Sequence, residues 1–146
     1  MNRQIYVNLP VKSLERSKQF FSSLGFTFDP QFTNDSGACM VIGENSYAML
    51  LAENFFQTFT KKPVADATRS TEVLVCLSCE SRGEVDELVR KALAAGGKAP
   101  NAPQDHGFMY GHGFEDPDGH MLEYLAMLDQ PPRPEAGIVA WSDWTS

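Results

Sequence analysis

The sequence predicts an α+β fold built from two similar βαβββ halves. In each half an alternating, strand-like segment precedes a helix that begins at a serine and ends at a glycine. Ser13 and Gly25 bound the first helix, and Ser81 and Gly96 bound the second. Three further strand-like segments follow each helix. A repeat of about 60 residues within one chain indicates two duplicated modules that pack together.

The first half begins with alternating apolar and polar side chains at residues 4–11, as expected of a strand with one buried face. Residues 14–24 carry an apolar stripe at helical spacing. Further strands are expected from residue 26 and at 39–42 and 47–51, and the last two form a hairpin across a turn that starts at Gly43.

Residues 52–69 connect the halves, and either a short helix or a lid over a cleft fits this segment. It contains Phe55, Phe56 and Phe59 close together. Such aromatic groups serve as core or subunit-interface anchors more often than as a cofactor site, so we expect these three to be core or interface anchors.

The second half repeats the same order. A strand is expected at 71–77, and Ser81 with Glu84 forms a capping box at the start of the second helix. Residues 98–103 are expected to form a weak strand, because two prolines interrupt it. The last two strands flank the turn Asp116–Gly119, in which proline and glycine favour a tight reversal.

Glu123 lies in the last of these strands, where alternation places it on the same face as Met121, Leu125 and Met127. A carboxylate on an apolar face must be paired, bound to a metal or protonated, because burying the charge alone is costly. Two interpretations therefore stay open: a structural carboxylate paired with a neighbour, or a functional one.

Composition narrows the choice of partners and compartment. The chain has 146 residues and a net charge of −7, which argues against nucleic acid or an anionic membrane as a partner. No apolar run approaches the ~20 residues of a membrane span. The first residues lead directly into a strand without a signal-peptide pattern, and three cysteines give no disulfide framework. We expect a cytoplasmic protein.

Two other patterns are weaker. Cys76 and Cys79 match the C-x-x-C spacing of redox sites, but alternation places them on opposite faces of a strand, so structural burial is favoured. His106, His112 and His120 show no metal-ligand spacing and are interpreted as surface or hydrogen-bonding residues.

The opening segment Val7–Ser17, with Phe20-Phe21 and Leu24-Gly25-Phe26, and the closing segment Phe114–His120 followed by Glu123 resemble the glyoxalase/bleomycin resistance/dioxygenase (vicinal oxygen chelate) superfamily. The resemblance covers residues 3–128, and the most similar members are bacterial proteins named as predicted lactoylglutathione lyases. It implies one domain at 1–128, with modules at about 3–60 and 70–128 whose curved mixed sheets surround a cleft. Residues 129–146 form a separate proline-rich tail.

Members that bind metal place one ligand on each of four strands. The resemblance puts these positions at Tyr6, at Leu50 and Leu74 to within a residue or two, and at Glu123. Only Glu123 is a usual ligand type, because leucine has no lone pair and a phenol binds divalent metals poorly. Glu72 is a conceivable substitute. We therefore expect no metal and no cofactor, with a divalent metal as the disfavoured alternative.

The expected function is a binding or resistance protein, or a metal-free enzyme, that holds a small organic molecule in an apolar cleft. Glu123 is the candidate catalytic residue, and the candidate ligand-binding residues are Tyr6, Asn8, Leu50, Leu74, Cys76 and Glu123. The alternative is a metal-dependent lyase or isomerase of the lactoylglutathione lyase type. The resemblance, together with the aromatic residues of the connector and with Trp141 and Trp144, leads us to expect a homodimer.

Overall fold

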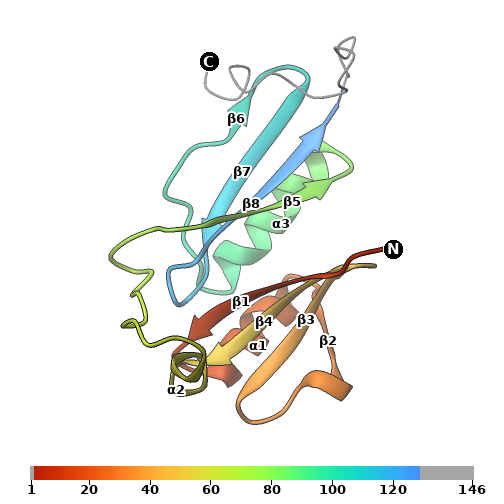
Figure 1. The fold of residues 1–146 in the computed structure, drawn as a ribbon. Helices are drawn as coiled ribbons and strands as arrows, with labels where there is room; N and C mark the ends of the chain where they lie inside the picture. Colours follow the sequence, from red (N-terminus) through yellow and green to blue (C-terminus); the bar gives the residue numbers. More distant parts are fainter. Residues whose placement is uncertain (1, 129–146) are drawn as a thin grey trace.

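The computed structural model describes residues 2–128, and the predicted tail at 129–146 lies outside them (Figure 1). The first module forms a four-stranded sheet in the order β1-β4-β3-β2. Its elements are β1 (Ile5–Val11), α1 (Leu14–Ser23), β2 (Thr27–Asp29), the 3-10 turn η1 (Pro30–Phe32), β3 (Gly37–Gly43) and β4 (Ser46–Ala52). β1 runs parallel to β4, and the other neighbours are antiparallel.

The second module repeats this topology with the order β5-β8-β7-β6. Its elements are β5 (Leu74–Cys79), α3 (Arg82–Ala94), β6 (Gln104–Asp105), β7 (Met109–Glu115) and β8 (Met121–Met127). β5 is parallel to β8, as β1 is to β4. The predicted α+β fold of two βαβββ modules with mixed sheets is confirmed.

Two predicted boundaries are different in the structure. The first strand of the second module begins at Leu74, three residues later than expected. The weak strand expected at 98–103 is reduced to a single bridge between Lys98 and Glu115, and the two-residue β6 follows it. Pro100 and Pro103 lack the backbone N–H that a continuous ladder needs.

The helix ends follow the sequence signals. The Ser13 hydroxyl accepts a hydrogen bond from the backbone N–H of Arg16, and the Ser81 hydroxyl accepts one from that of Glu84. Gly25 and Gly96 follow the last helical turns with φ of 99° and 101°, a conformation that glycine adopts without steric cost.

One hydrophobic core spans both modules. α1 and α3 contact each other on one side of the two sheets (Figure 1). The ring of Phe20 on α1 lies 5.8 Å from that of Phe114 on β7, which in turn contacts Tyr124 on β8. At Gly97 an added Cβ would lie 2.8 Å from the Glu115 carbonyl oxygen and 3.1 Å from the Phe20 ring, so this close approach needs glycine.

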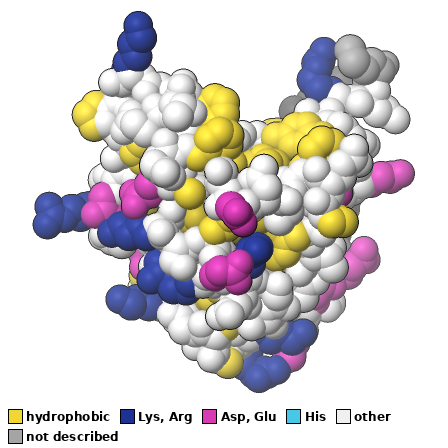
Figure 2. Space-filling view, turned by 90° about the horizontal axis from the view of Figure 1, so that it is seen from below, with side chains coloured by type: hydrophobic (Ala, Val, Ile, Leu, Met, Phe, Trp, Pro, Cys, Tyr) yellow, Lys and Arg dark blue, Asp and Glu magenta, His cyan; other side chains and the backbone are white. Residues whose placement is uncertain are grey.

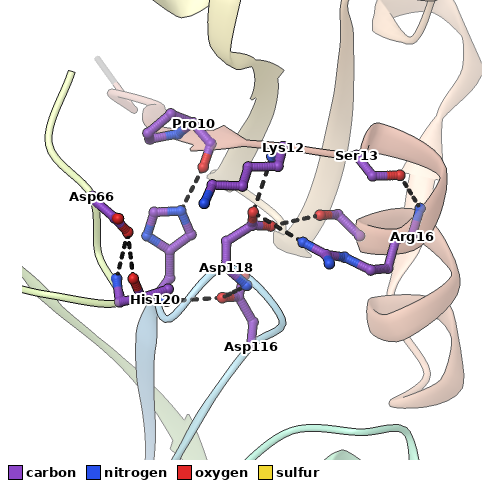
Figure 3. A network of polar contacts seen from close by, with 10 residues as sticks. Pro10, Lys12, Ser13, Arg16, Asp66, Asp116, Asp118 and His120 are labelled. Carbon is purple, nitrogen blue, oxygen red and sulfur yellow. Dashed lines mark hydrogen bonds and ion pairs between the residues drawn. The ribbon is translucent and has the colours of Figure 1, made fainter. Parts of the chain in front are cut away.

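The turn between β7 and β8 ties the second module to the first (Figure 3). One carboxylate oxygen of Asp118 accepts hydrogen bonds from the backbone N–H of Lys12 at 2.9 Å and from the Arg16 guanidinium at 3.2 Å. The other accepts from the Ser17 hydroxyl at 3.2 Å. His120 donates from Nε2 to the Pro10 carbonyl oxygen at 2.6 Å. Asp118, Ser17 and His120 are all buried.

Asp116 stabilises this turn by accepting hydrogen bonds from its backbone. Its Oδ1 accepts hydrogen bonds from the backbone N–H groups of Asp118 and His120, at 3.0 and 2.8 Å. Its Oδ2 is buried and has no hydrogen-bond partner among the described residues. Burial raises the pKa of Asp116 from 3.8 to about 6, against the lowering effect of His120.

We predict that Asp118→Ala lowers the free energy of unfolding by about 2–4 kcal/mol, because it leaves the Ser17 hydroxyl and the Lys12 N–H without their acceptor. Urea denaturation measures the change. Glu15→Ala is the control: it breaks only an exposed ion pair with Lys18 on α1 and costs less than about 0.5 kcal/mol. Equal losses in the two variants would contradict a special role for Asp118.

A second prediction concerns pH. Because the pKa of Asp116 is about 6 in the folded protein and 3.8 ordinarily, the folded state keeps a proton that the unfolded state has already lost between these values. The contribution of Asp116 to stability is therefore fully present below pH 3.8 and is lost as pH rises through 6, by up to about 3 kcal/mol. Asp116→Asn removes this loss, because the amide does not ionise.

The measurement is chemical denaturation of both proteins across this pH range. The difference in free energy of unfolding between Asp116→Asn and the original chain should grow in favour of the variant as pH rises. A difference that stays constant with pH would show that Asp116 does not titrate in this range.

Candidate functional site

Glu123 lies on the face of the second sheet that points away from the core, which we call the cleft face. Glu123 on β8 is the register partner of Cys76 on β5, and Met121 is the partner of Leu74, so these side chains share one face. Leu122 and Tyr124 project to the opposite face and are buried in the core. The alternation predicted for β8 is confirmed.

Glu123 lies in a small hollow of about 60 Å³, bounded by β7 and by the segment before β6. Its lining includes Asn101, Gln104, His106, Gly111, His112 and Gly113. An added Cβ at Gly113 would lie 2.7 Å from the Met121 methyl group and 2.9 Å from Cγ of Glu123. The absence of a side chain at Gly113 therefore allows Glu123 to lie across β7 beside Met121.

Cys76 is a neighbour of this carboxylate. Desolvation, and secondly the negative charge of Glu123, raise the pKa of the Cys76 thiol to about 11. Cys79 projects to the core side, and burial raises its pKa to about 12. Since the thiolate is the reactive form of cysteine, these raised pKa values disfavour a redox or nucleophilic role at neutral pH. The predicted burial is correct for Cys79 and wrong for Cys76, which is exposed.

The first sheet presents Tyr6 and Asn8 on its own cleft face. Tyr6 and Tyr47 are register partners, and their rings stack with centroids 4.9 Å apart and planes inclined by 12°. The Asn8 side chain donates to the Tyr6 carbonyl oxygen at 3.1 Å. Tyr6 is 45% exposed, so a large part of its surface is open to a ligand.

Of the two leucines predicted to bind a ligand, Leu50 is buried and Leu74 is exposed. Leu50 is fully buried in the core as the register partner of Leu9, so it faces away from the cleft and offers a ligand no surface. Its neighbour Met49, the partner of Asn8, takes the cleft-facing position, because a shift of one residue reverses a strand side chain. Leu74 is 56% exposed and shares a face with Glu123.

A larger pocket of about 340 Å³ lies where the modules meet. Its walls are the end of β1, the β7–β8 turn and the connector, which forms α2 (Glu53–Phe56) and η2 (Gln57–Phe59) and then continues to β5. The lining is mainly apolar, and its polar side chains are Asn8, Thr60, Lys62, Ser70, Thr71, Glu72 and His120. Met121 borders both this junction pocket and the Glu123 hollow, so the two spaces adjoin.

The surface also has hydrophobic areas. Seen from below the view of Figure 1, hydrophobic side chains gather in a hollow between two projecting parts of the molecule (Figure 2). Hydrophobic groups in a concavity with a few polar neighbours are the usual composition of a small-molecule site.

The residues at the expected ligand positions do not fit a divalent metal. Tyr6 offers a phenol, Leu74 offers no donor atom, and Met49, which takes the place expected for Leu50, offers only a thioether. Glu123 is the single carboxylate among them. Across residues 2–128, no three side chains of His, Cys, Asp or Glu lie together as a metal site would need.

The family model described as "Glyoxalase/Bleomycin resistance protein/Dioxygenase superfamily" matches residues 3–124. The chain belongs to this superfamily. A hypothetical protein from S. aureus is 31% identical, with a TM-score of 0.74 over 86% of this chain and 94% of that one. No curated protein matches the chain at a significant level.

Two more distant structures share the fold. A glyoxalase/bleomycin resistance protein/dioxygenase family enzyme from Burkholderia phytofirmans is 18% identical, with a TM-score of 0.73 over 87% of this chain and all of that one (100%). A bleomycin resistance determinant encoded on the transposon Tn5 is 19% identical, with a TM-score of 0.61, covering 88% of this chain and 100% of its own. Within residues 2–128 no helix is long and apolar enough to cross a membrane.

Two parts of the candidate site, Gly113 and the connector wall of the junction pocket, were not predicted from the sequence. Gly113 was detectable only as part of the glycine alternation Gly111–Gly113 in a predicted strand, a pattern that signals a close approach. The connector wall of the junction pocket has no periodicity from which its position could be predicted.

We predict that Gly113→Ala displaces Glu123 and Met121 and lowers the free energy of unfolding by about 1–3 kcal/mol, because the new methyl group overlaps both side chains. Thermal or urea unfolding measures the cost. Gly43→Ala is the matched control, since its Cβ would meet nothing within 4 Å, and it should change stability by less than about 0.5 kcal/mol. A neutral Gly113→Ala would mean that β7 and β8 have spare room.

Proposed function

We propose that this superfamily member binds a small organic molecule in the junction pocket, with Glu123 in the adjoining hollow acting on the bound molecule. The observation that carries the proposal is the pocket itself. Its volume of about 340 Å³ lies within the range of small-molecule sites, and both modules and the connector contribute to its walls. Two structural neighbours are named for resistance to small molecules, bleomycin and fosfomycin, and this supports the same class of ligand.

Each candidate residue has a role in this proposal. The apolar walls bury the body of the ligand, and Asn8 supplies an amide that can donate or accept hydrogen bonds. Glu123 accepts a hydrogen bond from the ligand or removes a proton from it as a general base. Tyr6, Leu74 and Cys76 extend the surface on the same cleft faces.

The proposal includes no metal, because the donor set at the expected ligand positions does not fit one. We also place the protein in the cytoplasm. All three cysteines are free, and free thiols are typical of a reducing compartment.

We predict that Glu123→Gln weakens binding and leaves the fold intact, because the amide keeps the shape of the side chain but loses its charge and basicity. A thermal-shift screen of small organic acids, amines and phenols identifies binders, and calorimetry compares the two proteins. Glu53→Gln on α2, outside both spaces, is the control. If Glu123→Gln unfolds the protein, the structural interpretation of this carboxylate is correct.

Elemental analysis and an activity assay distinguish this metal-free proposal from the alternative, a metal-dependent lyase of the lactoylglutathione lyase type. The proposal expects no stoichiometric Zn, Ni, Mn or Fe in the purified protein, and no turnover of a glutathione hemithioacetal when metal is added. About one metal ion per chain with metal-dependent turnover would establish the lyase instead.

We further propose a homodimer. Phe55 and Phe59 pack edge to face at 5.2 Å and are 38% and 69% exposed, an apolar area suited to a subunit contact. Trp141 and Trp144, also predicted for this contact, lie outside the described residues.

We predict a dimer in sedimentation velocity at micromolar concentration, and a shift toward monomer in Phe59→Ser. Phe32→Ser is the control, because Phe32 is similarly exposed, at 55%, but lies in η1 after β2 and not in the connector. A single species of 16.2 kDa for the original chain would refute the dimer.

A further inference from the structure

The junction pocket has one basic and one acidic side chain in its mainly apolar lining. Lys62 and Glu72 both belong to the connector, which links the two modules (Figure 1). The third titratable side chain of the lining, His120, is buried and donates from Nε2 to the Pro10 carbonyl oxygen. Lys62 and Glu72 are therefore the ionic groups of this lining that are open to a bound molecule.

Neither of these two charges has a partner in the described part of the chain. Each ion pair among residues 2–128 joins other side chains, so Lys62 and Glu72 pair neither with each other nor with a third group. A neutral molecule that displaced water from them would leave two charges without counter-ions, which costs free energy. A molecule with an anionic and a cationic group would offset this cost.

The backbone that carries Lys62 is held by hydrogen bonds within the connector. Its N–H donates to Oγ1 of Thr60 at 3.1 Å, and Nε2 of Gln57 donates to the carbonyl oxygens of Thr60 and Lys62, at 3.0 and 2.8 Å. Pro63 follows and restricts the backbone further. The ammonium group of Lys62 therefore extends from a fixed point shortly after η2.

Glu72 enters the pocket from the other end of the connector, two residues before β5. Leu74, the first residue of β5, is the register partner of Met121, which borders both the pocket and the Glu123 hollow. Glu72 and Glu123 thus make the acidic side of the site, and Lys62 supplies the positive charge from the connector near the first module.

We propose that the junction pocket selects a small amphoteric molecule, whose carboxylate pairs with Lys62 and whose ammonium group pairs with Glu72. The molecule is the ligand of the function proposed above, so this assignment of its class rests on that proposal. Its apolar body contacts Phe56, Val64 and Met121 in the pocket walls. The ammonium end then lies toward the hollow that holds Glu123.

Phenylalanine and three of its derivatives test this selection in calorimetric titrations of the full-length chain. At about pH 6.5, below the pKa of an α-amino group, phenylalanine is a zwitterion, phenylalaninamide a cation, N-acetylphenylalanine an anion and N-acetylphenylalaninamide neutral. The four compounds share one apolar body. We expect phenylalanine to bind about three- to tenfold more tightly than either singly charged derivative, because each of them lacks one ion pair in a partly hydrated site.

Two substitutions separate the contributions of the two charges. Lys62→Met should abolish the preference for phenylalanine over its amide and keep the preference over the N-acetyl compound. Glu72→Gln should have the opposite effect. Lys61→Met is the matched control, because Lys61 is the exposed neighbour of Lys62 but does not line the pocket, and both preferences should survive it. A purely structural role of either side chain would change all four affinities together.

Three results would overturn the selection of an amphoteric molecule. The first is equal binding of the four compounds, and the second is a pair of preferences that persists in Lys62→Met and Glu72→Gln. The third is a thermal-shift screen that finds binders while none of the four compounds binds, which would leave the pocket as a site for another class of molecule. A screen without any binder would contradict the proposed function itself, and the selection with it.

Discussion

The buried carboxylate of Asp118 is the interaction on which the arrangement of the two modules depends. A carboxylate removed from water needs donors, and three of them converge on it from the start of the first module: a backbone N–H, a guanidinium and a hydroxyl. The guanidinium of Arg16 is about half exposed, so part of the positive charge stays hydrated while the carboxylate does not. The neighbouring bond from His120 to Pro10 fixes the same turn a second time.

This connection determines the shape of the candidate site. The turn that carries Asp118, together with the two residues after it, contributes Gly119, His120 and Met121 to the junction pocket. Gly119 has a φ of 87°, and an added Cβ would lie 2.8 Å from the backbone of Ala67 in the connector. The same four-residue turn thus binds the first module, contacts the connector and leads into the strand that carries Glu123. A change in the turn would move all three walls of the pocket together.

Local patterns predicted much of this protein, and distant contacts explain the remainder. The serine caps, the glycine stops and the alternation in β8 each depend on residues a few positions apart, so the two modules and the direction of Glu123 were readable from the sequence. The orientation of Leu50 was not, because it follows from the register between β1 and β4. The partners of Asp118 were also hidden, since Ser17 lies 101 residues away in the chain.

The duplicated topology has a consequence for how a ligand is oriented. β1 corresponds to β5 and β4 to β8, so the pair Asn8 and Met49 in the first module is the counterpart of Cys76 and Glu123 in the second. The two modules share one topology, but their chemistry differs: one pair is neutral, and the other holds a carboxylate. A molecule that contacts both halves therefore meets two unlike ends, and of two opposite ways of lying in the site only one brings its hydrogen-bond donor to the acidic side. The broken symmetry gives the site a polarity that the fold alone does not have.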